Sequence, residues 1–301
     1  MTTDIRPPAA DVPTAAAQAP LPPGQVLHSA NCGLIIHRVG QLQYEFAAEG
    51  RQFGHDVLAY LNTAQAGAIT TFLYEEVLGT RDRLHWYIHL KSPHDYQRVL
   101  EMVDHDRDFQ DISERDRLED KGHGNWERMF VQGSIQERIF CPQHGQTHAG
   151  DGFDPKELFV PPARNQTAQP RELQLDTASC GALLHRTAEV RYDVREPARD
   201  FAAAWQERLN LALPGLVTSL LYEETFGKQD RIHWLIHLRS LADYPALRAA
   251  AGTPEAEELL GRDWVPASRG GGSWASMFIP GTIHDTVLVP YVGGVSPKLP
   301  L

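Results

Sequence analysis

The sequence predicts an α+β protein made of two tandem units that share one fold. The first observation is an internal repeat: residues 73–90 (LYEEVLGTRDRLHWYIHL) return as residues 221–238 (LYEETFGKQDRIHWLIHL), 148 positions later. The second is that other landmarks, such as Cys32 and Cys180, keep the same offset. A constant offset indicates that one folding unit was duplicated without net insertion. Its period is too long for a solenoid or a propeller, whose repeats span roughly 20–50 residues.

The first unit opens with a strand and a helix. Residues 34–39 form a short run of apolar and β-branched residues, which is typical of a buried strand. Residues 51–66 then place Phe53, Val57 and Leu61 at helical spacing. This spacing predicts a helix with one apolar side, which can pack against the sheet.

A hairpin, a second helix and a last strand follow. Residues 69–77 alternate and are rich in β formers, a Gly-Thr-Arg-Asp turn comes next, and residues 83–90 return as a strand. Residues 92–95 (SPHD) resemble a helix start with proline in the first turn. A final strand is expected over residues 134–140, so the order is β-α-β-β-α-β. The second copy repeats this order over residues 183–289.

That order is the ferredoxin-like split βαβ unit. Over residues 30–140 and 178–289 the chain resembles the dimeric α/β-barrel superfamily, as a tandem fusion in which one chain supplies both halves. The resemblance implies two ferredoxin-like βαββαβ units that form an intramolecular pseudo-dimeric α/β barrel, with helices outside and a cleft between the units. The superfamily includes cofactor-free monooxygenases, polyketide cyclases, isomerases and haem enzymes such as chlorite dismutase. Fold alone does not choose among these activities.

We expect five segments along the chain. The N-terminal tract is rich in Ala and Pro, and the stretch between the copies is polar and contains Pro, so neither is predicted to form regular structure. The expected boundaries are a disordered tail at 1–26, a first unit at 27–141, a surface linker at 142–177, a second unit at 178–291 and a loose tail at 292–301.

Composition limits the class of protein. The formal net charge of −11 argues against sequence-independent nucleic-acid binding, which requires Lys and Arg to neutralise phosphates. Three cysteines, no N-terminal signal pattern and no long apolar stretch predict a cytoplasmic protein that does not enter a membrane. The expected partner is a small-molecule substrate, and a homo-oligomer is compatible with this composition.

The histidines of the repeated segment share one side of their strand. Successive strand residues alternate faces, so His85, Tyr87 and His89 lie together, opposite a wholly apolar side. The apolar side should meet the helices, which leaves the histidine side for the cleft. The second copy repeats this pattern with His233, Leu235 and His237.

A simple hairpin register sets a carboxylate beside one histidine of each copy. Glu75 falls opposite His85, and the second copy repeats the pair as Glu223 and His233. A carboxylate beside an imidazole raises the imidazole pKa and fixes its tautomer, which suits a general base. A slip of one residue would put the next glutamate, Glu76 or Glu224, in that place.

These residues predict an enzyme that moves protons on a small apolar or aromatic metabolite, in a cyclisation, an isomerisation or a cofactor-independent oxygenation. The expected bases and their orienting carboxylates are His85, Glu75, His233 and Glu223. The expected substrate contacts are His89, His237, His37, His185, Tyr87, Arg38 and Arg186.

Other chemistries remain open for the same cleft. No cofactor is favoured, but a metal could be held by His85, His37 and Glu75, or by their counterparts His233, His185 and Glu223. His85 and His89 cannot share one ion, because four residues along a strand span about 13 Å. A haem held by one exposed cleft histidine is a second alternative, since the superfamily includes haem enzymes of this size. A third is a non-catalytic protein that binds a small ligand.

Overall fold

The computed structural model describes residues 12–144 and 161–293. Eight strands close into one antiparallel barrel with the order β1-β3-β2-β8-β5-β7-β6-β4. The predicted mixture of helices around a β barrel is therefore confirmed. The strands are β1 Leu34–Gln41, β2 Ile69–Leu78, β3 Arg83–Leu90, β4 Gln136–Pro142, β5 Ala182–Glu189, β6 Val217–Phe226, β7 Arg231–Leu238 and β8 His284–Pro290.

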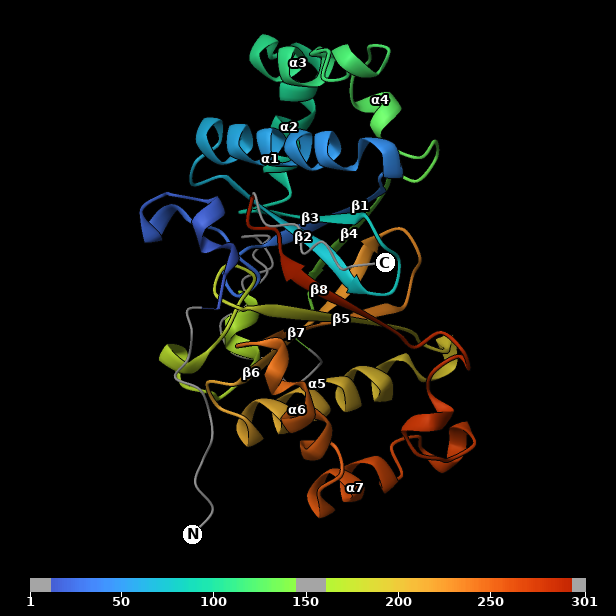
Figure 1. Ribbon diagram of the computed structural model, residues 1–301. Helices are drawn as coiled ribbons and strands as arrows, with labels where there is room; N and C mark the ends of the chain where they lie inside the picture. Colours follow the sequence, from blue (N-terminus) through green and yellow to red (C-terminus); the bar gives the residue numbers. More distant parts are fainter. Residues whose placement is uncertain (1–11, 145–160, 294–301) are drawn as a thin grey trace.

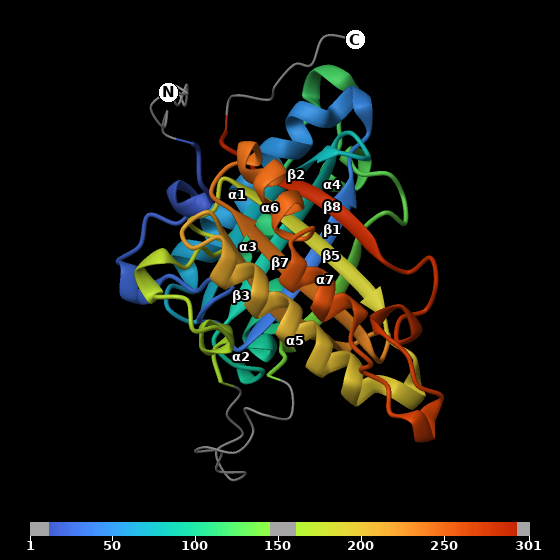
Figure 2. The same cartoon turned by 90° about the horizontal axis from the view of Figure 1, so that it is seen from below.

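Helices cover the barrel on two opposite sides (Figure 1). One layer contains α1 Ala47–Ala64, α2 His94–His105, α3 Arg107–Glu114 and α4 Trp126–Met129. The other contains α5 Arg195–Ala212, α6 Tyr244–Ala250 and α7 Pro254–Gly261, which lie across β5 and β7 in the turned view (Figure 2). Within the described residues, no helix has both the length and the apolarity needed to cross a membrane.

Short 3-10 helices connect these elements. They are η1 Ala15–Gln18, η2 Pro23–Gln25, η3 Tyr44–Phe46, η4 Glu119–Lys121, η5 Ala163–Gln166, η6 Arg171–Leu173, η7 Tyr192–Val194, η8 Leu241–Asp243, η9 Ala267–Arg269 and η10 Trp274–Ser276.

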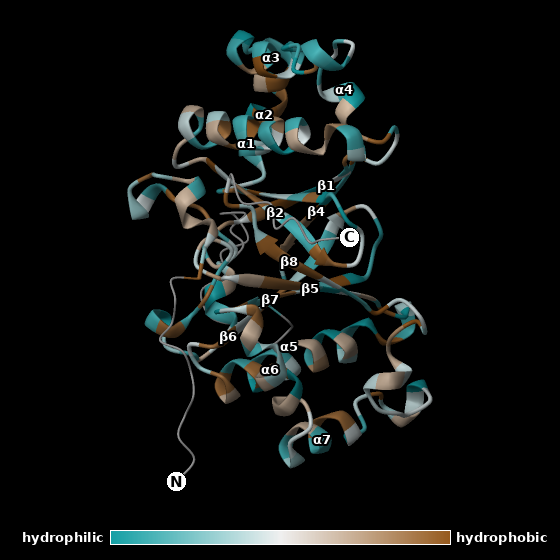
Figure 3. Ribbon diagram, in the orientation of Figure 1, coloured by the Kyte–Doolittle hydropathy of each residue, from teal (hydrophilic) through white to brown (hydrophobic). Residues whose placement is uncertain are grey.

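Each helix layer buries an apolar cluster against the outside of the barrel. One cluster surrounds Trp86 and Ile88, and the other surrounds Trp234 and Ile236. Figure 3 shows the complementary pattern, with α3 mostly hydrophilic on the outside of its layer. The apolar side of the repeated strand therefore meets the helices, as the alternation predicts.

The barrel closes where the edge strands of the two halves of the chain pair with each other. The first half has the strand order β4-β1-β3-β2 and the second has β8-β5-β7-β6. β2 pairs with β8, and β4 pairs with β6. The register inside the halves also matches, because Leu34 lies opposite Leu90 and Ala182 lies opposite Leu238.

The register of the first hairpin differs by one residue from the simple expectation. Tyr74 lies opposite His85, and Glu75 lies opposite Leu84. Tyr74 therefore belongs to the apolar cluster inside the barrel, whereas Leu73 packs on the helix side. The predicted pairing of Glu75 with His85 is wrong, because both sides of β2 are apolar here and alternation could not set the register.

One end of the barrel is closed by two chain segments that exchange hydrogen bonds. The backbone N–H of Ser29 donates to Thr177 Oγ1 and the N–H of Thr177 donates to Ser29 Oγ, each at 3.0 Å. The Tyr74 hydroxyl donates to the carbonyl oxygen of Thr177, and the Tyr222 hydroxyl donates to that of Ser29. All four residues are fully buried, so this end of the barrel is shut to solvent.

His89 and His237 anchor this closed end. His237 Nδ1 lies 2.8 Å from the carbonyl oxygen of Thr218, which can only accept, so Nδ1 carries the proton. Its Nε2 then accepts from the Ser29 hydroxyl at 2.9 Å. His89 repeats this arrangement with Thr70 and Thr177. These two histidines, which were predicted to contact substrate, therefore lie at the closed end and are absent from the lining of the cavity described below.

The buried pair should make the fold sensitive to acid. Burial lowers the pKa of His237 from 6.5 to about 4 and that of His89 to about 3. Below pH 6.5 the unfolded chain binds protons that the folded chain does not. The free energy of unfolding therefore decreases as the pH is lowered. Each histidine accounts for a loss of roughly 2 kcal/mol between its ordinary pKa and about pH 5.

We therefore expect His237→Gln to flatten the pH dependence of urea unfolding by about 2 kcal/mol over that interval. His94→Gln, at an exposed helix position, is the control and should leave the slope unchanged. A slope that is the same in His237→Gln and in the parent protein would show that this histidine titrates normally.

The described part of the N-terminal segment packs against the barrel. The Gln18 side chain donates to the carbonyl oxygen of Leu73 at 2.9 Å and accepts from the Leu73 N–H at 2.7 Å. Gln166, 148 positions later, makes the same two bonds with Leu221 at 2.7 and 2.8 Å. Each glutamine thus completes the hydrogen bonding of a strand, β2 or β6.

These contacts correct two expected boundaries. Residues 12–26 are not a disordered tail, because Ala15 and Gln18 are buried against the barrel. Residues 161–177 are not a linker over the surface, because Ala163 and Gln166 are buried in the same way. The remaining parts of the expected tails and linker, residues 1–11, 145–160 and 294–301, lie outside the described residues.

Candidate active site

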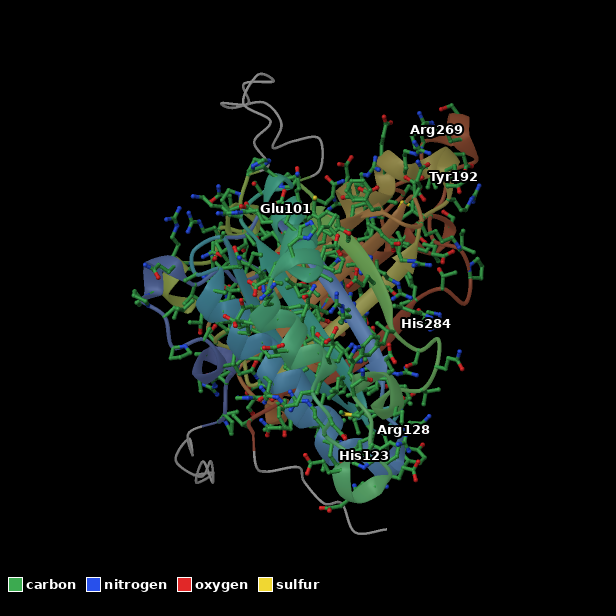
Figure 4. All side chains as sticks on the ribbon, turned by 90° about the horizontal axis from the view of Figure 1, so that it is seen from above. Glu101, His123, Arg128, Tyr192, Arg269 and His284 are labelled. Carbon is green, nitrogen blue, oxygen red and sulfur yellow. The ribbon has the colours of Figure 1, made fainter. Side chains whose placement is uncertain are left out.

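A cavity of about 480 Å³ lies toward the end of the barrel opposite to the one that the segments around Ser29 and Thr177 close. Both halves of the chain line it, so the halves share one cavity. In Figure 4, the lining residue His284 lies between Tyr192 and Arg269 of the second half and His123 and Arg128 of the first half. The lining residues used below are His37, His85, Arg83, Arg138, His185, Glu189, Arg231, His284 and Thr286.

Four histidines form one buried cluster at this cavity. His37 Nε2 lies 3.0 Å from His85 Nδ1, and His185 Nε2 lies 2.9 Å from His233 Nδ1. The rings of His37 and His185 are neighbours across the barrel, with centroids 4.9 Å apart. None of the four is more than 4% exposed. The cluster therefore joins the two halves of the chain inside the barrel.

A glutamate stands behind each pair. Glu76 Oε2 lies 3.6 Å from His85 Nε2, and Glu224 Oε2 lies 3.5 Å from His233 Nε2. A carboxylate can only accept, so it favours the tautomer with the proton on the facing Nε2. The Nδ1 of that ring then accepts from the Nε2–H of its partner, His37 or His185. We call Glu76, His85 and His37 the first relay, and Glu224, His233 and His185 the second relay.

The two relays end differently. The Tyr87 hydroxyl donates to His185 Nδ1 at 2.8 Å, which occupies the free lone pair of the second relay. Leu235 stands at the position equivalent to Tyr87 and has no hydroxyl. His37 Nδ1 has no hydrogen-bond partner among the described residues. The first relay therefore ends at a buried nitrogen with an unshared lone pair, in a histidine that lines the cavity.

Burial keeps these histidines neutral. It lowers the pKa of His37 and His185 well below the ordinary value, and the neighbouring histidines and Arg138 lower it further. Burial also lowers the pKa of His85 and His233, although Glu76 and Glu224 oppose this effect. A neutral imidazole has a lone pair that can accept a proton from a bound molecule.

The hydroxyl of Tyr87 should stabilise the fold through His185. We expect Tyr87→Phe to lower the free energy of unfolding by about 1–3 kcal/mol, because it leaves His185 Nδ1 buried without a partner. Tyr44→Phe removes a hydroxyl from a side chain that is 75% exposed and should have almost no effect. Urea unfolding at neutral pH measures the free energy of unfolding of both variants. Equal effects would contradict the hydrogen bond from Tyr87 to His185.

Glu75 and Glu223 are not the carboxylates of the relays. Glu75 is bound by Arg51, and Glu223 is bound by Arg199 at 2.5 and 2.9 Å. Both arginines belong to helices, α1 and α5, so both glutamates lie on the helix side. The predicted role of Glu75 and Glu223 as orienting carboxylates is wrong, and the one-residue slip puts Glu76 and Glu224 in their place.

Three more predicted substrate contacts lie outside the cavity. Arg38 is paired with Glu137, and Arg186 is paired with Asp285 at 2.7 Å, on the outer side of the barrel. Tyr87 is fully buried beneath the histidines. His37 and His185, in contrast, do line the cavity. Alternation gives this result for the arginines, because Arg38 and Arg186 follow His37 and His185 by one residue.

Sequence reasoning missed the charged residues of the cavity. Arg231 binds Glu189 at 2.9 Å and Glu224 at 3.0 Å, and Arg83 lies 3.5 Å from Glu76. Arg138 also lines the cavity, from β4. Alternation along the last strand could have found it, since Arg138 and the interior residue Phe140 are two positions apart.

The predicted metal ligands do not come together. Glu75 and Glu223 lie on the helix side, away from His85 and His233. In the described ranges, no group of three or more His, Cys, Asp or Glu side chains is placed to hold a metal ion. None of the four histidines is more than 4% exposed, so none of them is the exposed cleft histidine that was expected to hold a haem.

Comparison with solved structures supports the fold. An anthrone oxidase-like protein matches with a TM-score of 0.51 and 9% identity, over 91% of this chain and 99% of that one. A "putative monooxygenase" from Lactobacillus acidophilus NCFM matches with a TM-score of 0.50 and 8% identity, over 86% and 94%. A chlorite dismutase from Candidatus Nitrospira defluvii gives 0.45 and 14%, over 87% and 92%. The chain therefore has a dimeric α/β-barrel type of fold.

A sequence-family model covers almost the whole chain. It is described as "Family of unknown function (DUF6039)" and matches residues 5–296. No curated protein matches the chain.

Proposed function

We propose that this chain, which belongs to the family of unknown function DUF6039, is an acid–base enzyme acting on a small, largely apolar or aromatic molecule. The observation that carries the proposal is the first relay, which ends at an unpartnered nitrogen of a buried histidine that lines the cavity. A neutral imidazole ordered by a second histidine and a carboxylate is suited to general-base catalysis.

The roles follow from the order of the relay. His37 Nδ1 accepts a proton from the bound molecule. His85 Nδ1 holds the Nε2–H of His37, and Glu76 stabilises the positive charge that the two rings then share. His85 and His233 were expected to be the bases, but in this proposal they are positioning residues. His185 serves as a second, weaker base, because Tyr87 already occupies its lone pair.

The reaction classes that suit this site are cyclisation, isomerisation and cofactor-independent oxygenation, all of which begin with removal of a proton from carbon. The names of two structures of similar fold, a "putative monooxygenase" and an anthrone oxidase-like protein, agree with these classes. Fold likeness at this level does not carry an activity over, so the proposal rests on the relay.

We also infer that each half is a duplicated ferredoxin-like unit. The matched strand orders, the equivalent registers and the equivalent bonds of Gln18 and Gln166 support it. The first unit then includes residues 12–26 in addition to the expected range 27–141. The second includes residues 161–177 in addition to the expected range 178–291. A cytoplasmic location and further self-association stay predictions.

A labelling screen tests the proposed activity. Purified protein is incubated with a panel of small carbonyl compounds and aromatic ketones in D₂O, and separately under ¹⁸O₂, and products are analysed by mass spectrometry. The proposal expects deuterium or ¹⁸O incorporation that requires His37. Chemistry that survives the replacement of His37 and of His185 would overturn it.

The same preparation tests the alternatives. Protein purified without a metal-binding tag can be examined by elemental analysis and by its absorption spectrum. A stoichiometric metal or a haem would favour redox or hydrolytic chemistry instead. A ligand that binds and is recovered unlabelled would instead support a non-catalytic binding protein.

A further inference from the structure

Arg138 is a cavity arginine whose side chain has no partner among the described residues. It is half-buried on β4, and its side chain makes no ion pair or hydrogen bond with any residue of the described ranges. The two other cavity arginines are each paired with glutamate, Arg83 with Glu76 and Arg231 with Glu189 and Glu224. A half-buried guanidinium without a counter-charge is costly unless something else supplies the negative charge.

The position of Arg138 ties it to the first relay. Arg138 lies directly opposite His37 in the β1–β4 ladder. Side chains directly opposite on one face of antiparallel strands have Cβ atoms about 4.5–5.5 Å apart. Its positive charge also lowers the pKa of His37, after burial and the neighbouring histidines, and contributes to lowering the pKa of His85, His185 and His233.

The second half has no equivalent cation. Thr286 stands 148 positions after Arg138 and lies opposite His185 in the β5–β8 ladder. Glu189 is the one carboxylate among the described lining residues, and it is already bound by Arg231 and by Lys228. The unpaired Arg138 and His37, whose Nδ1 has no hydrogen-bond partner among the described residues, therefore face each other across the β1–β4 ladder.

We propose that the cavity binds a small molecule through a single anionic oxygen group, such as a carboxylate or an ionised phenol or enol, and that Arg138 anchors this group beside His37. The inference rests on the proposed function only in that it names the substrate class of the same cavity. Arginine binds a carboxylate with two parallel charge-assisted hydrogen bonds, which also fixes its orientation. The rest of the molecule then lies across the cavity toward Thr286 and His284.

Matched pairs of probes test the charge preference by equilibrium binding. The probes are 1-naphthoate against 1-naphthamide, and 4-nitrophenolate against nitrobenzene, each measured by calorimetry. We expect at least one anion to bind roughly 10- to 100-fold more tightly than its neutral partner, as hydrogen bonds to charged groups contribute about 1.5–3 kcal/mol. The pair that shows the preference tells a carboxylate from a phenol-like oxygen.

Two variants assign the preference to Arg138. Arg138→Thr copies the residue of the second half and should abolish the preference, whereas Arg38→Gln, one residue along from His37 on the outer side, should keep it. Anions that bind no tighter than their neutral partners, or that fail to bind, would overturn the proposal. A preference that survives Arg138→Thr would overturn the role of Arg138.

An NMR measurement covers the case in which Arg138→Thr folds poorly. In the parent protein, a bound anion should neutralise Arg138 and so raise the pKa of His37, which ¹⁵N shifts of the imidazole ring report. An unchanged His37 pKa at saturation would contradict anchoring beside it. Because neither readout needs turnover, a failed labelling screen with a retained anion preference would remove the proposed chemistry and leave the binding site.

Discussion

Replacing His37 with glutamine is expected to lower turnover of the compound identified by labelling by about 10²- to 10⁴-fold, the usual contribution of a positioned general base. Glutamine keeps a polar group in the buried site but has no basic nitrogen. The Michaelis constant should change little, because His37 acts on the proton rather than on the anchoring group. Single-turnover kinetics at neutral pH measure the loss directly.

His185→Gln is the matched control for this prediction. It removes the equivalent histidine of the second relay, whose Nδ1 already accepts from Tyr87. We expect a loss of less than about 10-fold, in keeping with a secondary role. Equal losses in the two variants would mean that the relays are interchangeable, and the asymmetry at Tyr87 and Leu235 would then have no catalytic meaning.

The pH dependence of turnover gives an independent readout. Burial and the nearby positive charge lower the pKa of His37 well below its ordinary value, so the base stays deprotonated in mildly acidic solution. Activity should therefore hold as pH falls through about 6.5, where an unperturbed histidine would be half protonated. Glu76→Gln should weaken the base without removing it, and a rate as low as that of His37→Gln would assign a direct role to Glu76.

Sequence pattern predicted the side on which residues lie but not their depth. Alternation separated His85 and His89 from Trp86, and both histidines do lie inside the barrel. They are four residues apart on one face, however, so one reaches the cavity and the other the closed end. Depth depends on the segments around Ser29 and Thr177, whose closing role nothing in the local pattern indicated.

Comparison of the two copies also hid part of the site. Residues kept in both copies include His37 and His185, which line the cavity. Arg138 was missed because its counterpart is Thr286. The effect of Tyr87 on His185 depends on a contact between the halves, which no single copy contains. The differences between copies therefore carry the functional asymmetry, whereas the similarities carry the fold.

The largest effect on stability is expected at Arg51, outside the cavity. Its guanidinium binds Glu75 and also Asp82 at 2.5 Å, and it donates to the carbonyl oxygen of Ala47 at 3.1 Å. Burial alone would lower the pKa of Arg51, but the bonds to the two carboxylates raise it above its ordinary value. Arg51 is only 7% exposed, so water has little access to the two carboxylates if the guanidinium is removed.

Arg51→Met should lower the free energy of unfolding by about 3–5 kcal/mol, because removing one partner of a buried ion pair leaves uncompensated charge. Arg199→Met is the control in the second half. There the carboxylates keep other partners, since Gln143 donates to Glu223 and Arg195 lies 3.1 Å from Asp230, and Arg199 itself is 25% exposed. Its replacement should cost about 1–2 kcal/mol. Urea unfolding midpoints compare the two directly.

A charge-neutral variant separates electrostatics from packing at Arg51. If uncompensated carboxylates cause the loss, Arg51→Met combined with Glu75→Gln and Asp82→Asn should recover much of it, because no buried charge then lacks a partner. Asparagine is tolerated at position 82, where φ is 58° and few other side chains fit. If the triple variant is no more stable than Arg51→Met, the arginine stabilises α1 against β2 by packing, and the ion pairs contribute little.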